Sequence, residues 1–112
     1  EITNALMGAV SRRIDFIHLP VPKDRNDEAY FAPLANLRLP SETSLYLGCV
    51  HHGDHGANAH KLNLASRHIE ISGIGSECGW GRGNPEDLDA ILASHCHLLD
   101  LNRQGLYFTR ND

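Results

Sequence analysis

Residues 69–82 read Ile69-Glu70-Ile71-Ser72-Gly73-Ile74-Gly75-Ser76-Glu77-Cys78-Gly79-Trp80-Gly81-Arg82, a strand-like run that leads into a cysteine and a glycine-rich turn. The apolar residues of this segment predict a strand over Ile71–Glu77. A thiol at a strand end is held by a rigid element and is still open to a cleft, which suits a metal ligand or a nucleophile. The alternative interpretation of Cys78 is a small buried hydrophobe beside a turn.

Two earlier segments also have the pattern of buried strands. Ile14–Leu19 is a compact apolar run that is stopped by Pro20. Ser44–Val50 is a second apolar run, and it leads directly into the pair His51 and His52. We therefore expect three strands in this chain.

The segments around the strands have helical patterns, and they are Ile2–Arg13, Ala29–Leu37, Ala57–His68 and a segment from Asn84 to Leu99. The last one opens with Asn84-Pro85-Glu86-Asp87, which predicts an asparagine cap, a proline at the first helical position and acidic residues in the first turn. Residues 101–112 carry no clear pattern and are predicted to form a tail.

Strands that alternate with helices predict βα units and a parallel sheet, hence an α/β fold. The pattern fits the closing segment of a (β/α)₈ (TIM) barrel, with residues 1–100 as the last three βα units. The polar residues at the strand ends are His18, then His51 with His52, then Glu77 with Cys78. Parallel strands bring these residues to one side of the sheet, where the active site of such a barrel lies.

Three segments resemble the last strands of one superfamily, and they are Ile17–Arg25, Leu45–His51 and Ser76–Glu86. It comprises the catalytic barrel of cobalamin-independent methionine synthase and its relatives within the uroporphyrinogen decarboxylase-like group. The resemblance covers Ile2 to Leu99, and its most specific part is the Glu-Cys-Gly element with the arginine downstream.

The resemblance implies a cofactor, substrates and site residues. Cys78 matches a cysteine that binds catalytic zinc in the synthase, and His18 stands where the synthase has an acidic zinc ligand. His51 and His52 fall near its catalytic histidine. Apart from the resemblance, Glu77 and Asp54 are predicted to bind substrate. The implied activity is methyl transfer, in methionine biosynthesis, from a methyl donor to a small-molecule thiol such as homocysteine.

One element of that family is missing, because no His-x-Cys pair precedes the first predicted strand. Cys78 and His18 then supply at most two of the three protein ligands that a catalytic zinc ion takes. The expectation is therefore a C-terminal fragment of a longer barrel protein, or a truncated gene product, that is inactive by itself.

Two other interpretations of the chain remain open. His52-Gly53-Asp54-His55 follows a predicted strand and resembles the zinc-binding motif of metallo-β-lactamase-type hydrolases, although Val50 stands where that motif has its first histidine. The second interpretation is a barrel remnant that binds a small ligand without catalysis.

Composition excludes several classes of function. The formal net charge is −4 with no basic run, so nucleic acid is not an expected partner. No apolar segment approaches the roughly 20 residues that span a bilayer, so no membrane partner is expected either. The chain contains three cysteines without tight spacing, which favours a reducing, cytoplasmic setting. Unpaired edges of so small a sheet predict self-association.

Overall fold

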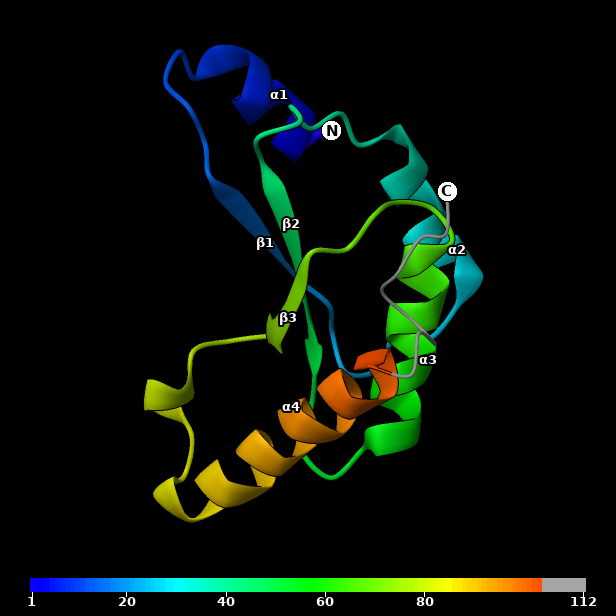
Figure 1. Cartoon of the computed structure of the whole chain (residues 1–112), viewed down its shortest axis with the longest axis vertical. Coiled ribbons are helices and arrows are strands. Elements are labelled where there is room, and N and C mark those ends of the chain that lie inside the picture. The colour runs from blue at the N-terminus through cyan, green and yellow to red at the C-terminus, as the bar shows by residue number, and fades with distance from the viewer. Residues whose placement is uncertain (104–112) are drawn as a thin grey trace.

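The computed structural model describes residues 1–103 and contains a three-stranded sheet in the order β1-β2-β3 (Figure 1). The strands are β1 (Phe16–Pro20), β2 (Ser44–Val50) and β3 (Gly73–Ser76). Both neighbouring pairs are parallel, so the three C-terminal ends open at the same edge. The prediction of three adjacent parallel strands in chain order is confirmed.

The outer strands are shorter than predicted, although their backbone pairing extends further. Ser44 N donates a hydrogen bond to Asp15 O at 3.0 Å, one residue before β1, and Val21 N donates to Gly48 O at 2.9 Å, one residue after it. The register between β2 and β3 shifts between Leu47 and Val50 of β2. This irregularity lies next to the C-terminal end of β3.

The helices are α1 (Ile2–Ala9), α2 (Glu28–Phe31), α3 (His55–Ser66) and α4 (Leu88–Arg103), with short 3₁₀ turns η1 (Ala32–Asn36), η2 (Trp80–Arg82) and η3 (Pro85–Asp87). Pro33 changes α2 into a 3₁₀ turn, because proline has no N–H for α-helical bonding. Asn84 is the N-cap residue of η3, with Pro85 at the start and Glu86 and Asp87 in the first turn as predicted, but its side chain makes no cap hydrogen bond. The helix that follows begins at Leu88 and continues past Leu99. Residues 104–112 of the predicted tail lie outside the described residues.

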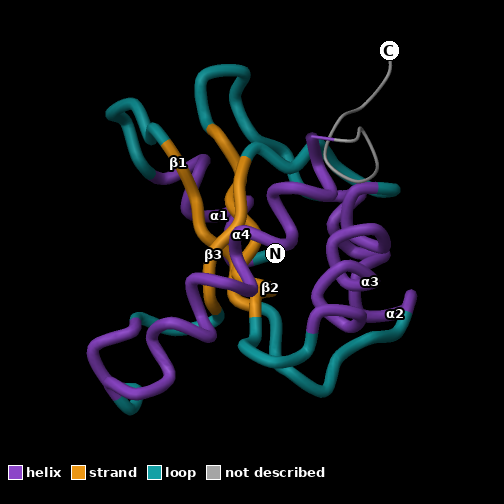
Figure 2. Tube along the Cα trace, turned by 60° about the horizontal axis from the view of Figure 1, so that its bottom comes forward, coloured by secondary structure: helices purple, strands orange, loops and turns teal. Residues whose placement is uncertain are grey.

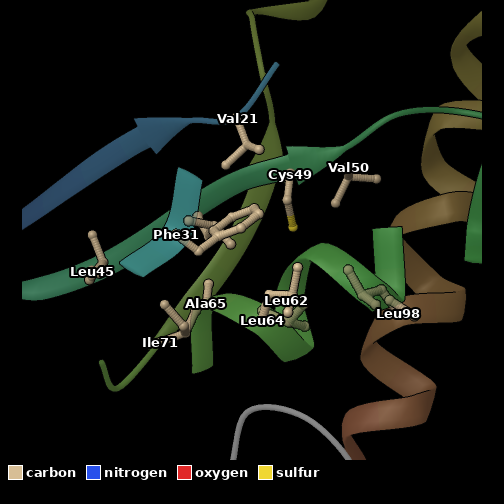
Figure 3. Packing of buried hydrophobic residues seen from close by; sticks show 12 residues of the cluster. Val21, Phe31, Leu45, Cys49, Val50, Leu62, Leu64, Ala65, Ile71 and Leu98 are labelled. Atoms are coloured by element: carbon tan, nitrogen blue, oxygen red, sulfur yellow. The ribbon is translucent and has the colours of Figure 1, made fainter. Parts of the chain in front are cut away.

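Helices cover one face of the sheet, and Figures 1 and 2 show α2 and α3 on that side. The buried cluster of Figure 3 joins alternate residues of β2 to α2, α3 and α4, and its members include Leu45, Leu47, Cys49, Phe31, Leu62, Ala65 and Leu98. Alternation places these β2 side chains on one face, as the period of a strand requires. Among the described residues, no helix is long and apolar enough to cross a membrane.

The opposite face of the sheet, which we call the open face, carries exposed aromatic side chains. Phe16 is 63% exposed and Tyr46 is 39% exposed, and their rings meet edge to face with centroids 5.7 Å apart. The structure thus shows an α/β fold with a parallel sheet that is covered on one side.

Candidate functional site

A pocket of about 260 Å³ lies at the C-terminal ends of β2 and β3. Four of the predicted site residues line this pocket, namely His51, His52, Glu77 and Cys78. Parallel pairing explains why they meet, because each follows directly after a strand that ends at the same edge. Residues that sequence reasoning did not assign to the site also line it, among them Lys23, Trp80 and Asp87.

Two hydrogen bonds between the backbone of His51 and the side-chain amide of Asn58 hold His51 in place. His51 N donates to Asn58 Oδ1 at 3.0 Å, and Asn58 Nδ2 donates to His51 O at 2.8 Å. Asn58 is buried on α3, so this amide fixes the end of β2 against the helix. The His51 Nε2 atom lies 3.0 Å from Val21 O. Because a carbonyl oxygen only accepts, Nε2 carries the hydrogen and Nδ1 is the acceptor atom of the neutral ring.

Each of the two pocket histidines lies near a carboxylate. His51 Nε2 lies 3.9 Å from Glu77 Oε2, and His52 Nε2 lies 3.9 Å from Asp87 Oδ2. His51 is the more enclosed of the two imidazoles, with a side chain 13% exposed against 48% for His52. Such pairs can take up and release protons when a reacting group binds between them.

The three free cysteines differ in environment. Cys78 and Cys96 are exposed, whereas Cys49 is buried in the core. Burial raises the pKa of the Cys49 thiol to about 12, so Cys49 is inert at neutral pH. Cys78 is therefore the accessible thiol of the pocket.

His18 does not line the pocket with Cys78. Its side chain extends over the open face, and its Nε2 donates a hydrogen bond to Ser76 O at 2.9 Å. The imidazole lies against Gly48 and Gly75, where a Cβ would come within 2.6 Å and 3.3 Å of it. His18 thus braces the end of β3 from the side opposite the helices.

The described residues contain no group of three or more His, Cys, Asp or Glu side chains that could hold a metal ion. Cys78 and His18 therefore do not form a complete zinc site within residues 1–103. The hydrolase-type motif is not assembled either. His52 faces Asp87, while His55 stacks on His97 with ring centroids 4.4 Å apart.

Asp54 lies outside the pocket lining, in the position before α3. Its backbone carbonyl accepts from Asn58 N at 2.9 Å, and the carboxylate acts on Lys61 electrostatically. Substrate binding by Asp54 stays a prediction.

Lys61 is a buried cation beneath the pocket that sequence reasoning missed. Its Nζ donates to Lys23 O at 2.7 Å, and the residue has no exposed surface. Burial lowers the pKa of Lys61, while nearby acidic groups, Asp54 foremost, oppose that shift. The sequence does contain a signal for the burial of Lys61, namely its helical spacing. Lys61 shares one face of α3 with Asn58, Leu62 and Ala65, and all four are buried.

No protein-family model, curated protein or solved structure matches this chain.

Proposed function

We propose that this chain is the C-terminal part of a (β/α)₈ barrel related to cobalamin-independent methionine synthase, and that its pocket belongs to the small-molecule site of that barrel. The observation that carries the proposal is the meeting of His51, His52, Glu77 and Cys78 in one pocket at the C-terminal strand ends. Catalytic residues of (β/α)₈ barrels come from this end of the strands. The open face is the side that the remaining strands of a closed barrel would cover.

In this proposal Cys78 supplies one ligand to a zinc ion. A catalytic zinc ion takes three protein ligands, and residues 1–103 assemble no such group. The other ligands therefore come from another segment or another chain. His18 would have to leave its hydrogen bond with Ser76 to join them.

The remaining pocket residues have roles that do not depend on the metal. A thiol substrate such as homocysteine loses its proton when it accepts a methyl group from the donor, and Nδ1 of neutral His51 is an acceptor for that proton. Glu77 stands beside His51 and suits a cationic group of the substrate. Because all three cysteines are free, a reducing, cytoplasmic setting fits the chain.

Calorimetric zinc titration tests this assignment of Cys78. We expect weak stoichiometric binding, because only part of the ligand set is present, and we expect Cys78→Ser to abolish it. Cys96→Ser is the matched control, since Cys96 is also an exposed thiol but does not line the pocket. A Cys78→Ser chain that binds zinc as well as the parent would refute the assignment.

The same titration separates the two other interpretations. Tight zinc binding by His51, His52, Asp54 and His55 that does not require Cys78 would favour the hydrolase-type site. Absence of zinc binding in every variant would favour a barrel remnant that binds a small ligand without catalysis.

A further inference from the structure

The pocket wall contains an indole ring whose orientation is fixed by its neighbours. Trp80 is 43% exposed, and its Nε1 donates a hydrogen bond to Ser76 Oγ at 2.6 Å. One side of the indole meets the His95 ring edge to face, with centroids 5.5 Å apart. An exposed tryptophan held in this way adds little to the core, so its ring surface is available to a ligand.

Two carboxylates lie in the lining of the same pocket. Among its described lining residues, Glu77 and Asp87 are acidic and Lys23 is basic. Glu77 lies 3.9 Å from His51, and Asp87 lies 3.9 Å from His52. These separations exceed hydrogen-bond length, so neither carboxylate is neutralised by a direct bond to its imidazole. Lys61 beneath the pocket partly offsets the charge of Glu77, and the two carboxylates are the groups that would contact a cation.

We propose that this pocket binds a small organic cation of the onium class, a quaternary ammonium or sulfonium group, between the Trp80 ring and the carboxylates of Glu77 and Asp87. Indole faces attract such cations, and aromatic side chains recognise quaternary ammonium ligands. The volume of about 260 Å³ is below the range for drug-sized ligands and suits a small headgroup. An onium cation also needs no set of coordinating atoms. This inference rests on the proposed small-molecule role of the pocket and names the class of ligand.

Fluorescence tests the proposal, because the chain contains one tryptophan and its emission reports on Trp80. Choline is the probe, and 3,3-dimethylbutan-1-ol, in which carbon replaces the charged nitrogen, is its uncharged isostere. We expect choline to change the emission saturably and the isostere to bind about tenfold more weakly. Equal binding of the two compounds, or saturable binding of acetate without binding of choline, would overturn the proposal.

Variants test the contacts by calorimetry. Glu77→Gln and Asp87→Asn should each weaken choline binding about fivefold, as expected for loss of one partly exposed charge. Trp80→Ala should abolish binding, and Trp80→Phe should retain part of it. Glu86→Gln is the matched control, because Glu86 is an exposed neighbour of Asp87 that does not line the pocket. Unchanged affinity in both carboxamide variants would overturn the proposal. Choline binding does not require a metal on Cys78, so failure here and failure of the zinc titration are separate results.

Discussion

His18 Nε2 donates a hydrogen bond to Ser76 O at 2.9 Å, and this contact joins the first strand to the third across β2. The imidazole can cross because Gly48 leaves space, since a Cβ there would lie 2.6 Å from the ring. The side chain of Ser76 in turn accepts the hydrogen bond of Trp80. A residue on the open face therefore helps to position the pocket wall.

Gly48→Ala should destabilise the chain by about 1–3 kcal/mol, because the new methyl group would displace His18 and crowd Ser76 O at 2.9 Å. Urea unfolding measures the change, and the emission of Trp80 should shift with it. Gly56→Ala is the matched control, because nothing lies within 4 Å of its Cβ position in α3. That control should change the stability by less than about 0.5 kcal/mol, because Gly56 is exposed in the first turn of α3. Equal effects of the two substitutions would contradict the role of His18.

Lys61→Met should stabilise the chain by roughly 1 kcal/mol at pH 7, because the cost of burying an ammonium group exceeds the value of its hydrogen bond to Lys23 O. Burial lowers the pKa of Lys61 below 10.5. The unfolded parent therefore binds more protons just below pH 10.5, and the stability of the parent rises with pH in that range. The difference in unfolding free energy between Lys61→Met and the parent should therefore decrease as the pH rises toward 10.5.

Urea unfolding at neutral and alkaline pH measures this difference. Lys23→Met is the control, because Lys23 is exposed and should show little dependence of its effect on pH. A methionine variant that is less stable than the parent by the same amount at both pH values would disprove the interpretation of Lys61.

Cys49 should make the folded chain sensitive to alkali. Its thiol has a pKa raised by burial from 9.0 to about 12, so the unfolded chain loses this proton first as pH rises. The stability that the protonated Cys49 thiol contributes is complete below about pH 9. Between pH 9.0 and about 12 it declines by about 1.4 kcal/mol for each pH unit. Under reducing conditions, the stability difference between the parent and Cys49→Ala should fall in this range. A difference independent of pH would contradict the assignment.

Self-association is expected through the open face and the edge strands β1 and β3. Sedimentation should show association that increases with concentration and that Phe16→Lys reduces, because Phe16 is 63% exposed on that face. Leu92→Lys serves as the control, since Leu92 is 43% exposed on α4. A monodisperse monomer at all concentrations would argue against this expectation.

The sequence predicted the parallel sheet because its strands are marked by continuous apolar runs. Ser44–Val50 was predicted with the bounds that the structure shows. Parallel pairing of the runs then predicts that residues following β2 and β3 meet, and His51 and Cys78 do line one pocket. The apolar runs and the parallel direction of the strands are therefore sufficient to predict this part of the site.

The placement of His18 was missed although the alternation of the strand indicates it. His18 was expected at the mouth of the sheet with Cys78. Its neighbours Ile17 and Leu19 pack against the core, so alternation turns His18 onto the open face. The contact of Trp80 with Ser76, in contrast, depends on the path of a loop, and neither residue type nor spacing indicates it.

Site-resolved NMR during zinc titration tests the central claim most directly, because it reports which side chains meet a ligand together with Cys78. The account predicts that the imidazole resonances of His51 and His52 and the indole N–H of Trp80 shift together, since all three residues line the pocket. His60 and His68, whose ring nitrogens contact Asn26 O and Glu28, should stay unchanged. Shifts confined to His55, His60 or His68, with His51 unaffected, would contradict the account.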